Sequence, residues 1–229
     1  NFNDDVQAFD VSLILQYLMN YIEFDWAQER LADVTLDSTV SALDASVILQ
    51  YIVELVDSLP HLDSLNALVA TGNTWMEDMQ VRIGQEYLLP VAIEEANNIY
   101  SIEGAIEFDP NAIQINDLVW NQSFGNFFIE EEPADGLIRF VVAGVNPVGG
   151  INELFKVNMK VLNGLTEPTF INLINLRLNE SSIIDVASSS EISQSVLSTD
   201  NEIPYQFTLH NNYPNPFNPE TNIQFDIPE

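Results

Sequence analysis

The sequence predicts a mainly β fold with a small α module, in which an N-terminal pair of loop-helix repeats precedes an antiparallel β-sandwich or jelly roll. The first observation is a repeated phrase, since residues 10–19 (DVSLILQYLM) and 44–53 (DASVILQYIV) are nearly identical. The second is a change of hydrophobic period, because apolar residues alternate singly with polar ones after residue 74. We expect four segments: a helical module at 1–56, a linker at 57–73, a sandwich at 74–200 and a distinct C-terminal segment at 201–229.

A polar loop precedes each copy of the repeated phrase. Residues 33–44 (DVTLDSTVSALD) place oxygen-bearing side chains at loop positions 1, 3, 5, 9 and 12. This is the spacing of an EF-hand calcium loop, in which alternate positions of a tight turn converge on one cation. The alternative is two acidic, turn-rich loops without metal, and position 6 holds Asp4 and Ser38 where the motif prefers glycine. The expected calcium ligands are Asp33, Thr35, Asp37, Thr39, Ser41 and Asp44 in the second loop, and Asn1, Asn3, Asp5 and Asp10 in the first.

Each predicted helix of the module carries two apolar stripes. In the first helix, one stripe recurs at i, i+3, i+4 and i+7 from Val11, and a second stripe lies on the opposite face. A two-helix module buries one stripe as its own core. The other is either a partner surface or packs on the chain's own β domain, and both alternatives stay open. The expected partner-binding residues are Leu13, Tyr17 and Tyr21 in the first copy, Val47, Tyr51 and Leu55 in the second, and Phe9 and Leu43 at the loop ends.

The pattern V-x-A-[FL]-D-x-S-x-I-L-Q-Y occurs in both halves of residues 1–56, and this duplication resembles a dockerin, the calcium-dependent module of cellulosomes. The resemblance implies near two-fold internal symmetry, bound Ca²⁺ and recognition of a cohesin through helix surfaces beside the calcium loops. Many dockerins carry a Ser/Thr pair at loop positions 10 and 11 that sets partner choice. Here these positions hold Ala8-Phe9 and Ala42-Leu43, so recognition of a cohesin must use apolar contact.

Residues 74–200 read as short strands separated by turns. Turn signals are DPNA (109–112), PADG (133–136), NPVGG (146–150) and NGLTEP (163–168). The serine-rich residues 181–200 are expected to form a last strand and then a linker. The expected strands follow alternating residues over 79–83, 89–93, 102–108, 155–161 and 169–178.

Residues 81–115 resemble the opening of a cohesin-type domain, on Pro90-Val91 and on Phe108-Asp109-Pro110-Asn111. The later strands Leu137–Val142 and Leu154–Val161 fit the strand order of that family, and the resemblance covers about residues 75–198. It implies a nine-stranded jelly roll that presents one sheet face to a dockerin.

The C-terminal segment contains YPNPFNPE, whose prolines indicate an ordered turn or extended stretch, followed by a strand with Ile223, Phe225 and Ile227 on one face. Residues 207–229 resemble the first strand of the type A sorting domain of the type IX secretion system. This resemblance implies export across a bacterial outer membrane to the cell surface or medium. The start NFNDD lacks the basic and apolar regions of a signal peptide.

Composition excludes several classes of function. The chain has 35 acidic and 6 basic residues, a net charge of −29, so it lacks the basic cluster that nucleic acid or anionic lipid requires. It has no cysteine, and no apolar run of about 18 residues that spans a membrane. The two histidines, His61 and His210, have no recognisable catalytic partners, and the charge run Glu130–Glu132 is expected in a solvated loop. No enzyme motif is present.

We therefore expect a non-catalytic, secreted interaction protein that joins a dockerin-like plug to a cohesin-like socket. If the plug of one copy fits the socket of another, the head-to-tail contact produces rings or filaments, and the expected assembly is an extracellular filament or lattice. Two alternatives remain. One is a scaffold or anchoring module of a polysaccharide-degrading, cellulosome-like complex that binds another chain. The other is a carbohydrate-binding module that stacks polysaccharide on aromatic residues, for which the candidates are Trp75, Trp120, Tyr87 and Tyr100.

Overall fold

The computed structural model describes residues 5–60, 69–181, 183–195, 208–209 and 225–226. It divides into two compact units, residues 1–194 and 195–229. In the second unit, β11 (Thr208–Leu209) pairs antiparallel with β12 (Phe225–Asp226), which lies within the strand predicted around Phe225. The YPNPFNPE string lies outside the described residues, as do Asn1, Asn3 and residues 61–68 of the predicted linker.

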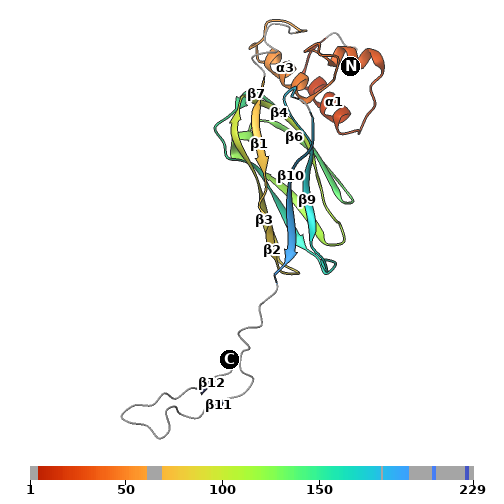
Figure 1. The fold of residues 1–229 in the computed structure, drawn as a ribbon. Helices are drawn as coiled ribbons and strands as arrows, with labels where there is room; N and C mark the ends of the chain where they lie inside the picture. Colours follow the sequence, from red (N-terminus) through yellow and green to blue (C-terminus); the bar gives the residue numbers. More distant parts are fainter. Residues whose placement is uncertain (1–4, 61–68, 182, 196–207, 210–224, 227–229) are drawn as a thin grey trace. The chain divides into compact units, whose positions relative to one another are not determined.

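Three helices form the N-terminal module (Figure 1). They are α1 (Ala8–Leu18), α2 (Trp26–Ala32) and α3 (Ala42–Ile52). In both copies of the repeat the last loop aspartate closes a capping box: Asp10 accepts from the Gln7 N–H at 2.9 Å, and Asp44 from the Ser41 N–H at 2.8 Å. Helix α2 was not predicted from the sequence, and Asp25 starts it by accepting hydrogen bonds at its N-terminus.

The rest of the first unit is a sandwich of two sheets, so the predicted fold class is confirmed. All strand pairs are antiparallel except β2 with β10, which run parallel. The four-stranded sheet has the order β1 (Thr71–Trp75), β3 (Glu86–Asn97), β8 (Glu153–Val161), β5 (Ile113–Trp120). The six-stranded sheet has the order β2 (Met79–Val81), β10 (Ile184–Gln194), β9 (Thr169–Leu178), β4 (Ile99–Glu107), β7 (Leu137–Val148), β6 (Phe128–Ala134).

The two sheets enclose an apolar core. Its aromatic centre joins Trp120, Phe140 and Phe155, with ring centroids of Trp120 5.4 Å from Phe140 and 4.7 Å from Phe155. Trp120 therefore contributes to packing, which is the commoner role of an aromatic residue in a sandwich. Trp75, in contrast, is 43% exposed.

Three loop predictions were wrong at least in part. The turn predicted at 133–136 keeps only residues 135–136, because β6 continues through Ala134. The charge run Glu130–Glu132 lies in β6, where each residue is half-buried, because an edge strand can carry charges on a solvated side. The predicted turn at 146–150 is shorter than expected, since β7 continues through Val148 and only Gly149–Gly150 remain for the turn.

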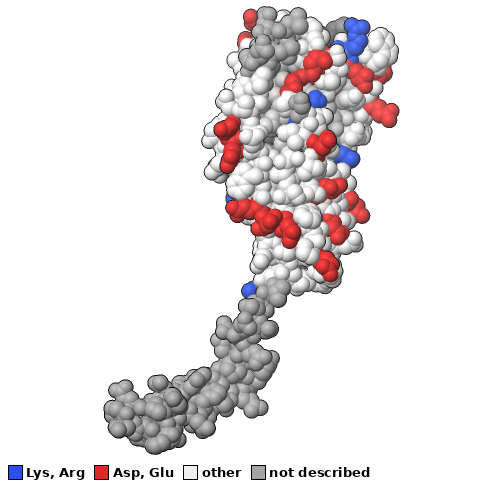
Figure 2. All heavy atoms as spheres, in the orientation of Figure 1, with Lys and Arg blue, Asp and Glu red and all other residues white. Residues whose placement is uncertain are grey.

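Figure 2 shows acidic side chains scattered over the visible face of the first unit, with few basic ones among them. Among the described residues, no helix combines the length and the apolar character needed to cross a bilayer.

Candidate interaction surface and cation loop

The helical module packs on the outer face of the six-stranded sheet. Helix α3 contacts β4 and β7, and α1 also contacts β7 (Figure 1). Val141 and Ala143 of β7 are fully buried in the same apolar cluster as the inward residues of α1 and α3. Every residue of α3 from Ala42 to Leu49 is buried. The module and the outer face of the six-stranded sheet therefore share an apolar cluster, which is separate from the core between the two sheets.

Ser46 of α3 satisfies backbone groups that the sheet leaves unpaired. The β4–β7 ladder shifts register between Ile99 and Ser101, so that backbone groups beside the shift lose their ladder partners. The Ser46 hydroxyl donates to the Tyr100 carbonyl at 2.9 Å and accepts from the Gly144 N–H at 3.3 Å. This fully buried side chain thereby joins α3 to both strands at once.

Glu103 of β4 meets the N-terminus of α3. Its carboxylate accepts a hydrogen bond from the Ala42 N–H, in the first turn of α3, where the helix dipole favours negative charge. The Arg177 Nε lies 3.7 Å from the other Glu103 oxygen. Burial raises the pKa of Glu103, while Arg177 and the Ala42 N–H oppose that rise. The contact thus places a buried carboxylate at the N-terminus of α3, where Arg177 and the Ala42 N–H offset part of its negative charge.

The loop from Asp33 to Asp44 is curled by its own polar side chains. Asp33 accepts from the Ser38 N–H at 3.0 Å, and Asp37 from the Thr39 N–H at 2.7 Å. Ser38, at loop position 6, has φ 76°, the left-handed conformation for which the motif prefers glycine. Asp44 Oδ1 accepts from the Thr35 N–H at 3.1 Å. The backbone therefore follows the tight turn that the spacing of the loop predicted.

A carboxylate from the sandwich enters this loop. Glu180, between β9 and β10, accepts at its Oε1 from the hydroxyl of Thr35 at 3.2 Å and from that of Ser41 at 3.0 Å. Its Oε2 is buried without a hydrogen-bond partner. Burial and the carboxyl groups of Asp37 and Asp44 raise the pKa of Glu180 to about 8. Burial also raises the pKa of Asp44 to about 6.

The donor types of this loop suit a hard cation, since all are carboxylate or hydroxyl oxygens and Glu180 Oε2 has no partner. Within the described ranges, however, no three carboxylate or histidine side chains stand in a metal-holding arrangement. Asp44 is one reason, because its oxygens are turned toward backbone N–H groups. The residues that would hold a cation are Asp33, Thr35, Asp37, Ser41, Asp44 and Glu180.

The remaining predicted ligands are placed differently. Thr39 is exposed, and its hydroxyl donates to Asp37 at 2.7 Å. In the first loop, Asp5 is exposed and Asp10 is half-buried as the capping residue of α1. The structure therefore describes one complete loop and the second half of the other.

The predicted partner residues divide into two sets. Leu43 and Val47 are buried, so this part of the second stripe belongs to the shared core and presents no surface. This favours the alternative that the second stripe of α3 packs on the chain's own β domain. The others keep some exposed area: Leu13, Tyr17 and Tyr51 are half-buried, and Phe9, Tyr21 and Leu55 are exposed by 57%, 50% and 61%.

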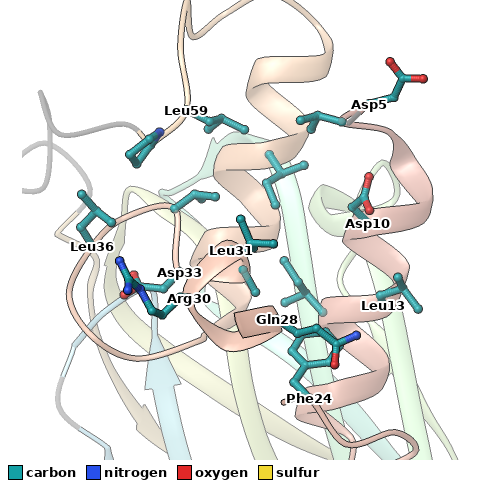
Figure 3. A pocket seen from close by; sticks show the side chains of 16 residues that line it. Asp5, Asp10, Leu13, Phe24, Gln28, Arg30, Leu31, Asp33, Leu36 and Leu59 are labelled. Carbon is teal, nitrogen blue, oxygen red and sulfur yellow. The ribbon is translucent and has the colours of Figure 1, made fainter. Parts of the chain in front are cut away.

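A groove lies on the other side of the module, between its three helices (Figure 3). Its volume is about 380 Å³. Apolar side chains of Leu13, Phe24 and Leu31 line it, with Asp5 and Asp10 at its edge. Tyr17 stacks on Phe24 beside it, with ring centroids 4.4 Å apart.

Sequence reasoning missed Ser46, Glu103 and Glu180. Ser46 lies within the repeated phrase, so the repeat was the available signal, but the identical Ser12 is less buried. Glu103 and Glu180 belong to the sandwich and carried no sequence signal, because their roles depend on which face the module covers.

Residues 1–53 match the family model described as the Dockerin type I domain. A search of curated proteins finds no match.

Solved structures similar to the chain are cohesins. One is a non-cellulosomal cohesin from the archaeon Archaeoglobus fulgidus, 18% identical with a TM-score of 0.47, where the match covers 60% of this chain and 100% of that one. Another is a cohesin module of a Clostridium perfringens family 33 glycoside hydrolase, 22% identical with a TM-score of 0.44, covering 56% and 100%. A third is from a type I cohesin–dockerin complex of Clostridium thermocellum, 13% identical with a TM-score of 0.47, covering 55% and 99%.

Proposed function

We propose that this chain is a non-catalytic interaction protein in which a dockerin domain and a cohesin-like sandwich recognise each other. The observation that carries the proposal is the covered sheet face, where α3 contributes apolar residues, the Ser46 hydroxyl and its N-terminus to β4 and β7. Plug and socket thus meet within one chain. The polar contacts fix the register of the docked module, and the apolar contacts supply most of the binding free energy.

We propose further that Ca²⁺ is the cofactor and that the loop from Asp33 to Asp44 holds it. The family match, the alternate oxygen donors and the left-handed Ser38 support this assignment. Calorimetric titration of the chelator-treated chain with Ca²⁺ tests it. Saturable binding that Asp33→Asn and Asp37→Asn weaken is expected, and a chain that binds no Ca²⁺ contradicts it.

The same contact can form between copies. A module that docks on the sandwich of a neighbour uses identical surfaces, and this head-to-tail exchange yields closed rings or an open filament or lattice. The chain then acts as a homo-oligomer-forming structural protein. This proposal requires that the module leave its own sandwich at high protein concentration.

Mixing chains of natural and heavy isotope content tests the exchange. After incubation at high concentration, a dihydrazide links neighbouring carboxylates, for which Asp37 and Glu180 are a suitable pair. Exchange predicts links that join light to heavy chains, together with higher masses by light scattering. A monomer whose links stay within one isotope would limit the function to the intramolecular contact.

A second candidate function is anchoring to a separate chain, as in a polysaccharide-degrading, cellulosome-like complex. The exposed Phe9, Trp26 and Leu31 of the module favour it, since large exposed apolar side chains mark protein-interaction surfaces and Leu31 also lines the groove. The test is a binding assay with isolated cohesins, comparing the full chain with its Phe9→Ser/Trp26→Ser variant. Equal capture of both would contradict it.

We also propose an extracellular or cell-surface location, reached by type IX secretion across a bacterial outer membrane. The support is the resemblance of residues 207–229 to a sorting segment. Fusing these residues, with the rest of a sorting domain, to a reporter in a type IX secreting bacterium tests it. A reporter retained inside the cell would contradict it.

A further inference from the structure

The position of Glu180 is set by the sandwich and not by the loop it enters. The neighbouring Asn179 is 1% exposed and has φ 51°. Its Oδ1 accepts from the Tyr100 N–H at 2.8 Å and the Ser101 N–H at 3.0 Å, and its own N–H donates to the Ser101 carbonyl at 3.0 Å. The Leu178 N–H donates to Ser181 Oγ at 3.1 Å. These contacts position the turn that carries Glu180 through atoms of the sandwich alone.

Acceptors outnumber protons where Glu180 meets the loop. The single hydroxyl proton of Thr35 faces three carboxylate oxygens: Asp44 Oδ1 at 3.0 Å, Glu180 Oε1 at 3.2 Å and Asp33 Oδ1 at 3.5 Å. The Ser41 hydroxyl faces Glu180 Oε1 at 3.0 Å and Asp44 Oδ2 at 3.3 Å. Two hydroxyl protons thus face four carboxylate oxygens. Backbone N–H groups also donate to both Asp44 oxygens, whereas Glu180 Oε2 is buried without a hydrogen-bond partner.

Such a site needs positive charge. Thr35, Ser41 and Asp44 are fully buried, so water has little access to this side of the loop, whereas Asp37 is exposed and Glu180 is half-buried. The side chain of Asp37 lies within hydrogen-bonding reach of Glu180, and two carboxylates this close share either a proton or a cation. The neighbouring Arg177 is engaged with Glu103. Since the side-chain atoms that face one another between Glu180 and the loop are carboxylate and hydroxyl oxygens, a divalent hard cation fits this site.

We propose that Glu180 is a ligand supplied by the sandwich to the cation of the dockerin loop, so that binding the cation fastens the module to the sheet. This inference rests on the proposed Ca²⁺ site and adds to it a ligand from outside the loop. It makes the docked state the high-affinity state for Ca²⁺. By linkage, Ca²⁺ shifts the equilibrium toward docking by the same factor that docking adds to its affinity.

The experiment compares the full chain with Glu180→Gln and Glu180→Asp. Glutamine keeps an acceptor for Thr35 and Ser41 but lacks the charge, and aspartate keeps the charge but is one methylene shorter. Glu94→Gln is the matched control, because it removes one charge from the exposed face of β3. We expect each Glu180 variant to bind Ca²⁺ about 10–100-fold more weakly in calorimetric titration, and Glu94→Gln to bind like the parent.

Hydrogen exchange provides the second measurement. In the parent chain, Ca²⁺ is expected to slow amide exchange both in the loop 33–44 and in the turn 178–181 of the sandwich. In Glu180→Gln, only the loop is expected to respond. Unchanged affinity in Glu180→Gln, or turn protection that persists in it, would overturn the inference and leave the loop site standing. A parent chain that binds no Ca²⁺ would refute the proposed site itself, and this inference with it.

Discussion

The two copies of the repeat have nearly the same sequence and unequal surroundings. In α3, residues 42–49 are all buried, whereas α1 buries only Val11, Ile14 and Leu15. The clearest contrast is at loop position 11, where Phe9 is 57% exposed and Leu43 fully buried. The cause is position in the fold, because α3 packs against α1 on one side and against β4 and β7 on the other, while α1 makes only a small contact with β7.

This difference teaches that the internal symmetry of the module is broken by docking. A duplicated sequence supplies two equivalent faces, and the sandwich of the same chain covers the face of the second copy. The equivalent face of the first copy is not covered in this way, and its apolar residues such as Phe9 stay exposed. Substitutions at equivalent positions of the two copies therefore measure how much the sandwich contributes to the free energy of unfolding, because the local sequences are nearly the same.

The largest effect is expected for Leu43→Ala against Phe9→Ala. Removing the buried Leu43 side chain leaves a cavity and should lower the free energy of unfolding by about 2–5 kcal/mol. Truncating the exposed Phe9 should change it by about 0.5 kcal/mol or less. Urea unfolding followed by circular dichroism measures both. Equal losses in the two variants would contradict the asymmetry.

The next effect is a pH dependence located in the second loop. The folded pKa of Asp44, about 6, exceeds the ordinary value of 3.8, so the native chain binds its proton more tightly than the unfolded chain does. In chelator, this contribution is fully present below about pH 4 and is lost as the pH rises to about 6, by at most about 3 kcal/mol. Glu180, with a pKa of about 8, extends the loss upward.

Thermal unfolding between pH 4 and 8 measures this dependence. Asp44→Asn should flatten the lower part of the curve and Glu180→Gln the upper part, while Asp10→Asn serves as the control in the first copy. A parent chain whose stability does not fall over this interval relative to Asp44→Asn would contradict the burial of Asp44.

A smaller effect is expected for Ser46→Ala against Ser12→Ala. The first leaves the Gly144 N–H and the Tyr100 carbonyl without their partner in a buried site, at about 1–2 kcal/mol. In the first copy, the half-buried Ser12 accepts a hydrogen bond from the Gln16 side chain at 3.0 Å, and losing this bond should cost about 0.5 kcal/mol or less. Hydrogen exchange at Gly144 reports the first effect specifically, and exchange unchanged in Ser46→Ala would argue against the contact.

The smallest difference is expected between Tyr17→Phe and Tyr51→Phe. The Tyr17 hydroxyl donates to Glu29 at 2.9 Å in an exposed setting, so its removal should cost about 0.5 kcal/mol. Both phenylalanine variants keep the apolar ring. A loss above about 2 kcal/mol in Tyr17→Phe, measured by urea unfolding, would mean that this hydrogen bond is more buried than the structure indicates.

Much of the fold was predictable because its patterns are local. Single alternation identified the strands that face a core on one side, such as β4 and β8. The edge strand β6 was not predicted, because Glu130–Glu132 interrupt the alternation of apolar and polar residues. The short helix α2 was not predicted, because its only sequence signal was the capping box at Asp25. A local sequence pattern predicts whether a side chain faces the core, and it does so best for strands in the centre of a sheet.

The candidate site was predictable only in part. The loop spacing identified the donors from Asp33 to Asp44, since they are close in sequence. The contact of Glu180 with Thr35 joins residues 145 positions apart, and no local pattern encodes it. Ser12 and Ser46 make the same point, because identical residues in identical motifs differ in burial once one helix meets the sheet.

The short length of the connection between α3 and β1 bears on the proposed exchange of modules between copies. Only residues 53–70 separate Ile52 from Thr71, so the module is tethered close to its own socket. A partner on a short tether acts at an effective concentration in the millimolar range, which free copies at micromolar concentration do not match. If copies exchange modules as proposed, the chain should cap its own sandwich while dilute, and exchange should begin only where the protein accumulates to comparable concentration.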